Sequence, residues 1–588
     1  MALGWLVLAP IMLPWLGALA VWLMRNRRQQ AQPWLAVGFA VAATLATLAL
    51  LPSATAKAAV RINVGGVFGL FTLVPDGLAL FLTTIATVVG SLTLLFSTAY
   101  MRDESEPGRY YALVLLFIGS MAGLVLSGSL LFLFLFWEMT AFCSYALIAY
   151  HNDDPKAVAG GIKALIITQV GGVGLLLASL LAYASLGDYQ IATLLTGAPA
   201  LPAGILGAIA FACLLAAAAK SAQIPLHIWL PDAMAAPTPV SALIHAATMV
   251  NAGVYLLARL FPAFAAVPGW QTAVITLGLL STLLAGTMAV VATDLKRVLA
   301  YSTISQLGFM VYAIGTGALF AGEFHLLSHA VFKALLFLAA GAIIHALGTR
   351  DMRQMGGLWR QMPFVAVVFI MGAAALMGLP PFNGFWSKEL LLAGGLAQGP
   401  FWAYLGMLLG TGITALYTAR MVWYVCFGQP ATGKAAHTTP VAMRLALAPL
   451  ALATLATWLV AGRFAAWLAA TASPTLPVHR PEFLSTTELV THLLFDVATI
   501  VTLVVVALGV TLWWWRGRLA WATGRLGGLQ HAAAQGFGFE WLARRPAQLI
   551  QAAAAALQQT QSGQLNWNVA GMVIGLIIVL AIVAGGIS

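Results

Sequence analysis

The chain has 588 residues, of which 61% are hydrophobic and only 8% are Asp, Glu, Lys or Arg, with a formal net charge of +11. A soluble domain needs a charged shell around its apolar core, and this composition excludes one. The basic residues are dispersed in short loops without an interleaved aromatic platform, which argues against nucleic-acid binding. The sequence therefore predicts an all-α polytopic membrane protein with no nucleic-acid partner.

Apolar windows of about 20 residues, the length of a spanning helix, recur along the whole chain. They predict about sixteen transmembrane helices, with a change of pattern near the C-terminus. The predicted regions are 1–110 with three spans, 111–262 and 263–428 with five spans each, 429–515 with two spans, an amphipathic helix in 516–565 and a final anchor in 566–588.

The loops after odd-numbered spans hold most of the basic residues. By the positive-inside rule these loops lie in the cytoplasm, so both termini are expected outside. The basic residues on the expected cytoplasmic side are Arg25 to Arg28, Arg102, Arg109, Lys156, Lys163, Lys296, Arg297, Arg350, Arg353, Arg360, Arg516, Arg518, Arg525, Arg544 and Arg545. The exceptions, after even-numbered spans, are Lys57, Arg61, Arg259, Arg463 and Arg480.

The two five-span blocks share one feature, because the fourth span of each carries a lysine and is interrupted by proline. In the first block Lys220 precedes Pro225, and in the second Pro380 and Pro381 precede Lys388. An odd number of spans turns the second block over, which predicts an inverted repeat of the kind found in secondary transporters. Simple kinks in packed helices are the alternative, but the coincidence of break, lysine and position favours an ion site.

Three ionisable residues lie inside long apolar runs: Glu138, Lys220 and Lys388. A charge at bilayer depth costs at least a few kcal/mol, so such residues usually mark an ion pathway, the alternative being a structural ion pair. In contact, Glu138 and Lys220 favour each other's charged state, whereas separation drives the lysine toward neutrality and releases a proton. Glu389 repeats this chemistry beside Lys388, although neighbours in sequence point about 100° apart on a helix.

A ladder of titratable groups follows in EFHLLSHAVFKALLF. His325, His329 and Lys333 are spaced by four, so they share one face of a helix with about 6 Å between steps. Histidine titrates nearest physiological pH, which suits this face to proton relay. His245 is alone in its segment, and it is a link only if the fold brings it between Lys220 and this ladder.

The sequence offers no cofactor or metal motif. Cys143, Cys213 and Cys426 lie in apolar segments without CxxC spacing, and neither GxGxxG nor GxxxxGK[ST] occurs. The histidine ladder lacks a third soft ligand, and Lys333 would repel a cation. We therefore expect no cofactor, metal or redox centre in this chain, so that any redox chemistry belongs to partner subunits.

The segment from Arg516 to Trp567 is too polar to span a membrane, yet an apolar stripe runs along it. Leu542, Leu549, Ile550 and Leu557 recur at intervals of seven and eight residues, which is typical of an amphipathic helix. We expect this helix on the cytoplasmic side, along the membrane or a neighbouring protein, interrupted near Gly536 and Gly538. The alternative is a short surface helix without a partner.

Three stretches carry a family resemblance. KSAQIPLHIWLPDAMAAPTPVSALIHAATMVNAGVYLLAR (220–259), DLKRVLAYSTISQLGFM (294–310) and FHLLSHAVFKALLFL (324–338) resemble the antiporter-like subunits of respiratory complex I and of Mrp-type cation/proton antiporters. The amphipathic segment followed by TQSGQLNWNVAGMVIGLIIVL is similar to the lateral helix and final anchor of the largest, distal subunit of this kind in complex I.

The resemblance implies a proton-translocating subunit of an NADH:quinone oxidoreductase in a bacterial-type inner (plasma) membrane, enzymatic only as part of that complex. Its expected partners are other membrane subunits, including sister antiporter-like subunits, with the lipid bilayer around them. The transported ion is H⁺, or Na⁺ if the chain is instead the A-type subunit of an Mrp-type antiporter. The relay residues that the resemblance implies, together with the neighbours argued above, are Glu138, Lys220, His245, Lys296, His325, His329, Lys333, Lys388 and Glu389.

Two departures leave the parent complex open. TQVGG (168–172) stands where the complex I subunit typically has TRVGD, and GLPPFNGFWSKE (378–389) is closer to the Mrp-type pattern. We favour a complex I or complex I-like oxidoreductase, with the Mrp-type antiporter as the close alternative. A membrane scaffold whose polar residues only lock helices together is a third interpretation.

Overall fold

The computed structural model describes residues 2–24, 30–53, 59–429, 439–471, 485–518 and 525–543, together with four single positions between 545 and 555. The chain divides into two compact units, Met1–Gly527 and Gly528–Ser588, and each is described by itself. The structure is 82% helical, and 14 of its helices are long and apolar enough to cross a membrane. The predicted class, an all-α polytopic membrane protein, is confirmed.

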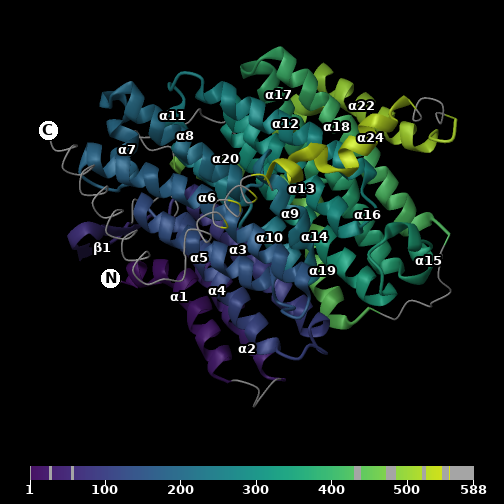
Figure 1. Ribbon diagram of the computed structural model, residues 1–588, viewed down its shortest axis with the longest axis horizontal. Coiled ribbons are helices and arrows are strands. Elements are labelled where there is room, and N and C mark those ends of the chain that lie inside the picture. Colours follow the sequence, from purple (N-terminus) through teal and green to yellow (C-terminus); the bar gives the residue numbers. More distant parts are fainter. Residues whose placement is uncertain are drawn as a thin grey trace. The chain divides into compact units, whose positions relative to one another are not determined.

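Three long helices and a small hairpin form the N-terminal region (Figure 1). They are α1 (Ala2–Leu23), α2 (Gln32–Leu50), β1 (Val60–Gly65), β2 (Gly69–Leu73) and α3 (Gly77–Tyr100). The hairpin was not predicted. Its strands pair antiparallel with an irregularity between Asn63 and Gly65, and glycines with positive φ at Gly66 and Gly69 make the turn.

The first block contains the expected interruption and one that was not expected. Its helices are α4 (Pro107–Leu126), α5 (Leu130–Ile148), α6 (Pro155–Leu186), α7 (Ile191–Gly197), α8 (Ala203–Lys220), α9 (Trp229–Asp232), α10 (Thr238–Ala246) and α11 (Asn251–Phe264). As predicted, α8 ends at Lys220, ahead of Pro225. The second break separates α10 from α11. Here the side chains of Thr248 and Asn251 donate hydrogen bonds to the carbonyls of Leu243 and Ala246, at the end of α10.

The second block is interrupted at the predicted place. Its helices are α12 (Trp270–Val291), α13 (Leu295–Thr316), α14 (Leu319–Leu347), α15 (Leu358–Gln361), α16 (Pro363–Met377), α17 (Asn383–Gln398) and α18 (Phe401–Val422). Gly378, with φ of 86°, ends α16 in the left-handed conformation that favours glycine. The predicted twelfth span is therefore two helices of 15 and 16 residues, each shorter than a full span.

The C-terminal helices of the first unit are α19 (Val441–Ala456), α20 (Ala461–Thr471), α21 (Thr486–Leu494) and α22 (Val497–Trp514). The two spans predicted in 429–515 correspond to Val441–Leu468 and Val497–Trp514. The short helix α21 was not predicted, although Ser485 and Glu488 form a capping box at its start.

Only part of the predicted lateral segment is described. It includes α24 (Gly527–Ala534) and a 3₁₀ turn, Gly536–Gly538, in which Phe537 leaves the helical conformation. The interruption expected near Gly536 and Gly538 is thus present. The stripe residues Leu549, Ile550 and Leu557, the anchor 566–588, and the basic residues Arg25 to Arg28, Lys57, Arg480 and Arg544 lie outside the described residues.

The polar interior is built around α10, α11, α13 and α14, of which α10, α13 and α14 lie in the middle of the view in Figure 1. The window from Thr238 to Phe264 is 100% buried and that of α13 is 94% buried. By contrast, α22 is 22% buried and presents large apolar side chains outward, as lipid or a neighbouring subunit requires. Polar groups on the four central helices are therefore shielded from the membrane by the rest of the bundle.

Candidate functional site

Glu138, on α5, places its carboxylate against α6. Both carboxylate oxygens are buried, and the side chain of Gln169, on α6, interacts with the carboxylate. Space for the carboxylate exists because residue 172 is glycine, since a Cβ there would collide with Oε1 of Glu138. The final glycine of TQVGG, Gly172, thus leaves room for the Glu138 carboxylate. An aspartate at position 172, as in TRVGD, would bring a second carboxylate onto Glu138 in this arrangement.

Lys220 is fully buried at the last turn of α8. Its Nζ donates a hydrogen bond of 2.8 Å to the carbonyl of Trp137 and lies 5.1 Å from the centre of that indole ring. Lys220 and Glu138 interact electrostatically, but no direct ion pair joins them within the described chain. Lys220 therefore binds the residue of α5 that precedes Glu138, and the two predicted partners are close without direct contact.

The predicted ladder is present on α14. His325, His329 and Lys333 are fully buried. The ring of His325 lies between the Ser387 hydroxyl, at 3.0 Å from Nδ1, and the Gln306 side-chain oxygen, at 3.2 Å from Nε2. His329 has no hydrogen-bond partner among the described residues and stands edge-on to Phe332.

Lys333 turns toward α13, where its Nζ donates a hydrogen bond of 3.2 Å to the Leu299 carbonyl and another to the Ser302 hydroxyl. Lys296 lies at the start of the same helix and donates a bond of 2.6 Å to the Ala236 carbonyl. Both ammonium groups therefore sit on backbone carbonyls, as Lys220 does, which is the arrangement expected for buried polar groups.

His245 lies on α10 beside the ring of Phe337, with 4.8 Å between the ring centres. Neither of its ring nitrogens has a hydrogen-bond partner among the described residues. Its electrostatic neighbours are Lys333, Lys296 and His329, which places it at the ladder. His245 was expected to be a link only if it lay between Lys220 and the helix with His325, His329 and Lys333. It lies near that helix, but none of its interactions reaches Lys220.

Lys388 and Glu389 diverge, as the helical angle between neighbours requires. Nζ of Lys388 donates a hydrogen bond of 2.8 Å to the Leu376 carbonyl, in the last turn of α16, and lies 5.5 Å from the centre of the Phe309 ring. Lys388 interacts electrostatically with His325 and Lys333. Glu389 instead faces Thr499 and Thr502 of α22. Lys388 thus belongs to the interior, while Glu389 reaches the outer side of the bundle.

One basic residue assigned to a loop is in fact a buried ion-pair partner. Arg259 lies within α11, 8% exposed, and its two terminal nitrogens bind the two carboxylate oxygens of Asp76. Asp76 is also the N-cap of α3, accepting a hydrogen bond of 2.9 Å from the amide of Ala79. Counting Arg259 as an exposed loop charge was wrong, because this side chain is bound inside the bundle.

Sequence reasoning also missed Glu323, the fifth residue of α14. This carboxylate is 2% exposed, and neither oxygen has a hydrogen-bond partner among the described residues. Its electrostatic neighbour is Arg259. The only sequence signal was the acidic residue that opens the EFHLLSHAVFK run.

At the opposite end of the bundle, loop charges bind one another. Asp232 pairs with Lys163 at 2.6 Å and with Arg297 at 3.5 Å. Asp351 accepts hydrogen bonds from the side chain and amide of Arg353, and these bonds hold the pKa of Asp351 below its usual value. Arg297 lies at the start of α13, Arg353 follows the end of α14, and Lys163 lies in the first half of α6, on the side where the positive-inside argument placed them.

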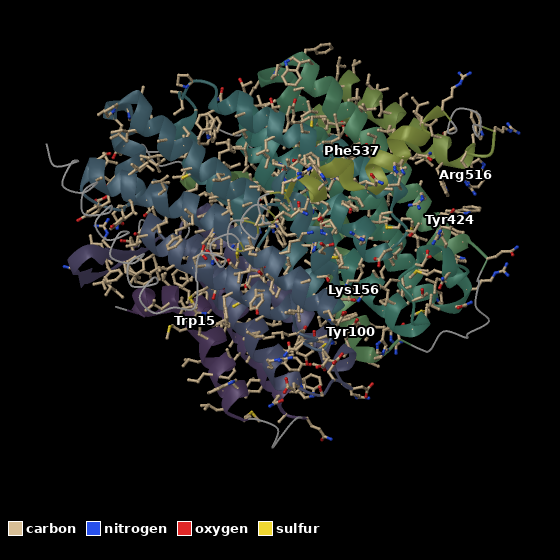
Figure 2. The ribbon with its side chains drawn as sticks, in the orientation of Figure 1. Trp15, Tyr100, Lys156, Tyr424, Arg516 and Phe537 are labelled. Carbon is tan, nitrogen blue, oxygen red and sulfur yellow. The ribbon has the colours of Figure 1, made fainter. Side chains whose placement is uncertain are left out.

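Arg516 opens the predicted lateral segment directly after α22 (Figure 2). Its guanidinium lies 4.2 Å from the ring centre of Trp513 and 5.7 Å from that of Trp423. Arginine stacked on tryptophan at the end of a spanning helix is typical of a membrane interface.

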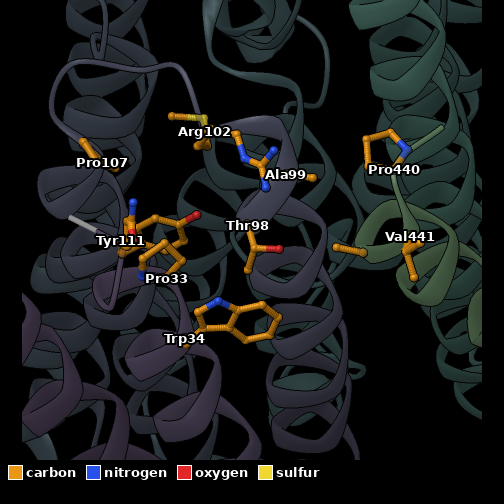
Figure 3. A pocket seen from close by; sticks show the side chains of 12 residues that line it. Pro33, Trp34, Thr98, Ala99, Arg102, Pro107, Tyr111, Pro440 and Val441 are labelled. Atoms are coloured by element: carbon orange, nitrogen blue, oxygen red, sulfur yellow. The ribbon is translucent and has the colours of Figure 1, made fainter. Parts of the chain in front are cut away.

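A separate pocket of about 730 Å³ opens where α2, α4 and α19 begin and α3 ends (Figure 3). Its lining includes Trp34, Arg102 and Tyr111 and none of the predicted relay residues. Within the residues that the structure describes, no group of three or more His, Cys, Asp or Glu has a geometry that could hold a metal ion.

Two family descriptions match the chain. The one described as NADH:quinone oxidoreductase/Mrp antiporter, TM, matches residues 127–414. The one described as NADH-Ubiquinone oxidoreductase (complex I), chain 5 N-terminus, matches residues 62–111.

Similar proteins come from both branches of the resemblance. NADH-quinone oxidoreductase subunit L of Escherichia coli (strain K12) is 39% identical over 553 residues, covering 87% of each chain. A probable K(+)/H(+) antiporter protein of Rhizobium meliloti, of the A/B type, is 38% identical over 460 residues, which is 76% of this chain but 46% of that protein. A chain in the Mrp complex from Dietzia sp. DQ12-45-1b has a TM-score of 0.85 at 29% identity, covering 100% of this chain and 63% of its own.

Interrupted helices with buried lysines that donate to backbone carbonyls define a polytopic membrane protein of the antiporter-like class. Together with the matches above, the chain belongs to the family of antiporter-like membrane subunits shared by NADH:quinone oxidoreductases and Mrp antiporters. The resemblance noted in the sequence is thereby confirmed.

Proposed function

We propose that this chain is the proton-translocating, antiporter-like subunit of a complex I or complex I-like NADH:quinone oxidoreductase. Redox chemistry in partner subunits drives a conformational and electrostatic change, and this chain converts that change into proton movement. The observation that carries the proposal is two sets of interacting ionisable groups in the bundle interior, one in each half. The groups are Glu138 and Lys220 in one half, and His245, Lys296, Lys333, His329, His325, Lys388 and Glu389 in the other.

The first half works as a switch. Lys220 donates to the Trp137 carbonyl, one residue from Glu138, whose carboxylate interacts with Gln169. When the lysine side chain swings onto Glu138, each group stabilises the charge of the other. When it swings away, burial in an apolar environment disfavours the ammonium, which then gives up its proton. A small side-chain movement is therefore enough to load and unload a proton.

The second half works as a relay. The ring of His325 already bridges Ser387 and Gln306, so it can accept a proton on one nitrogen and release one from the other. His329 and His245 have rings without fixed hydrogen bonds in the described chain, so both nitrogens are available for transfer. Lys388 and then Glu389 lead from these histidines toward α22.

The two interrupted spans support an inverted repeat. In each block the lysine lies at the break, donates to a backbone carbonyl and lies over an aromatic ring, Trp137 for Lys220 and Phe309 for Lys388. With odd-numbered loops in the cytoplasm, both termini lie outside and the lateral segment lies on the cytoplasmic side. Sister subunits in the same membrane would then contact the apolar outer faces of the bundle.

Sequence similarity supports the complex I assignment. The E. coli oxidoreductase subunit L is 39% identical over 87% of this chain, and the R. meliloti antiporter protein is 38% identical over 76% of it. The second proposal, the A-type subunit of an Mrp-type Na⁺/H⁺ antiporter, is favoured by the Dietzia Mrp chain, whose TM-score of 0.85 holds over 100% of this chain. The GLPPFNGFWSKE sequence also points to the Mrp type.

The experiment that separates the two is purification of the intact complex through an affinity tag on this chain, followed by spectroscopy and protein identification. Flavin and iron–sulfur signals in the purified complex, with quinone-dependent NADH oxidation that acidifies one side of proteoliposomes, support the oxidoreductase. Small membrane antiporter subunits without flavin or iron–sulfur signals, and Na⁺-dependent collapse of an imposed pH gradient, would support the Mrp-type antiporter instead.

A further inference from the structure

Glu323 is a buried acid outside the proposed relay. It is 2% exposed, and neither carboxylate oxygen has a hydrogen-bond partner among the described residues. On α14 it stands two positions before His325, so the two side chains point about 200° apart. Glu323 therefore faces away from the histidine ladder, toward α3 and α11.

An ion pair lies on that side. Arg259 interacts electrostatically with Glu323 but places its two terminal nitrogens on Asp76 and its Nε 3.3 Å from the Tyr255 hydroxyl. The Tyr255 hydroxyl in turn donates a bond of 2.8 Å to the Val125 carbonyl. Arg259 is thus held between two carboxylates, bound to one and free of the other.

The remaining walls are apolar. Phe81 of α3, Phe320 and Phe324 of α14 and Phe464 of α20 form one contiguous group of rings, with centres 4.3 to 6.2 Å apart. The neighbouring basic residue of α20, Arg463, is exposed and points outward. Among the described residues, the charged and titratable groups that face Glu323 are therefore Arg259 and Tyr255, with Asp76 behind them.

An ionised carboxylate without hydrogen bonds in such a place costs several kcal/mol, so burial favours the neutral acid. Arg259 cannot pair with an ionised Glu323 without leaving Asp76, because its guanidinium group binds both carboxylate oxygens of Asp76. Arginine keeps its proton in every state, so a change in its partner must be matched by a proton on the carboxyl that it leaves.

We propose that Glu323 and Asp76 exchange one proton by competing for Arg259, and that this exchange forms an exit gate for the relay. In the state described here Glu323 carries the proton and Arg259 pairs with Asp76. In the second state the O–H bond of Glu323 is broken, an O–H bond forms on Asp76, and Arg259 moves to the Glu323 carboxylate. One proton is transferred, and the net charge of the three groups is the same before and after.

The gate lies at one face of the membrane. Asp76 caps the start of α3, and Glu323 is the fifth residue of α14. Arg259 lies in the second half of α11, and Val125 is near the end of α4. The Asp76 side chain is 16% exposed, so a proton that reaches it is one step from water. The distribution of basic loops puts this end outside, the side to which a respiratory pump releases protons.

Covalent labelling of the intact complex in membranes tests the exchange without relying on transport. A hydrophobic carbodiimide such as dicyclohexylcarbodiimide adds to a protonated carboxyl in an apolar place, and peptide mass spectrometry locates the adduct. We expect Glu323 to be labelled in the native protein. In Asp76→Asn the arginine loses its anionic partner and turns to Glu323, so labelling of Glu323 should fall by about tenfold, because arginine holds its partner carboxylate ionised.

Glu106→Gln is the matched control. Glu106 is an exposed carboxylate that pairs with Arg109 at the start of α4, at the other end of this helix from Val125. It should leave labelling of Glu323 unchanged. Absence of a Glu323 adduct in the native complex, or equal labelling in Asp76→Asn and the native protein, would overturn the exchange. If Asp76→Asn fails to assemble, Asp76→Glu keeps the charge and should retain labelling of Glu323.

The role as an exit gate rests on the proposed function, and a second measurement separates the two. Glu323→Gln mimics the protonated acid and keeps Arg259 on Asp76, so the complex should assemble and oxidise NADH while the protons moved per NADH decrease. Full pumping in Glu323→Gln together with loss of pumping in Lys220→Ala would remove the gate and leave the proposed function standing. Full pumping in both would remove both.

Discussion

Lys220 donates its hydrogen bond to the carbonyl of Trp137 and not to the carboxylate of Glu138, the very next residue of α5. The two opposite charges are thus neighbours without being paired, and a rotation of the lysine side chain would join them. Lys388 repeats this arrangement on the Leu376 carbonyl at the second interrupted helix. Each lysine therefore has a backbone carbonyl as an alternative partner, inside α5 for Lys220 and at the end of α16 for Lys388.

Gly172→Ala tests the place reserved for the Glu138 carboxylate. The added Cβ would collide with Oε1 of Glu138, so the carboxylate must move away from its present position. Overpacking of this kind costs about 1–3 kcal/mol. We expect near-normal amounts of assembled complex and reduced proton pumping per NADH, measured in inverted membrane vesicles.

Gly171→Ala is the matched control. Its Cβ would meet Ala219 at 2.6 Å and Ala216 at 3.2 Å, which crowds the contact between α6 and α8 without touching Glu138. We expect this variant to lower the amount of complex while the pumping ratio of the remaining complex stays normal. Identical behaviour of the two variants would show that Gly172 serves packing alone.

Substitutions of His325 and His329 distinguish a role in transport from a role in packing. Replacing His325 by alanine leaves Ser387 and Gln306 without their shared partner, at a cost of about 1–3 kcal/mol. His329 has no such hydrogen bonds in the described chain, so His329→Ala should reduce pumping with a much smaller loss of thermal stability. Thermal unfolding of the purified complex and pumping in vesicles measure the two effects.

The double variant gives the sharper outcome. If His325 and His329 are parallel steps of one relay, replacing both should cost more pumping than either single change. Loss of protein level without loss of pumping ratio would assign both side chains to packing. A normal coupling ratio in the double variant would leave only that structural role.

The ion pair between Arg259 and Asp76 is expected to contribute strongly to the free energy of unfolding. Removing one partner leaves an uncompensated buried charge, so Arg259→Ala is expected to destabilise the protein by about 3–5 kcal/mol. The double variant with Asp76→Ala should lose less than the sum of the two single losses, which chemical unfolding in detergent measures. An effect below about 0.5 kcal/mol, as for a surface charge, would restore the loop assignment of Arg259.

The lateral segment is tested by cysteine placement. If it braces sister subunits, Leu549→Cys on the predicted apolar stripe should crosslink to other chains and resist water-soluble thiol reagents. Gln548→Cys, at an exposed position, should be labelled from the cytoplasm. Labelling of Gln548→Cys from the outside would reverse the predicted topology, and even labelling of both positions without crosslinks would show that the segment braces nothing.

Features that depend on local sequence were predicted well. Proline beside a lysine in an apolar run located both interrupted helices, and the spacing of four placed His325, His329 and Lys333 on one face. Hydropathy shows how long an apolar segment is, but it does not show whether the helix in that segment is continuous. The break between α10 and α11 was therefore missed. Its carbonyls are satisfied by Thr248 and Asn251, whose spacing has no distinctive pattern.

Features that depend on tertiary partners were beyond the sequence. Arg259 looked like a loop charge because its partner Asp76 lies 183 positions away. His245 was placed near Lys333 and Lys296 only by the tertiary packing, in which α10 lies against α14. The sequence likewise showed Glu138 and Gly172 separately, and only the contact between α5 and α6 explains why one requires the other.

Proton pumping by the intact complex carrying Lys220→Ala or Lys220→Arg tests the central claim most directly. The measurement is the number of protons moved per NADH oxidised in sealed vesicles, with the amount of assembled complex determined in parallel. If Lys220 must gain and lose a proton, alanine should abolish the contribution of this chain, and arginine should also impair it because its guanidinium does not deprotonate. Full pumping at normal assembly in Lys220→Ala would contradict the account.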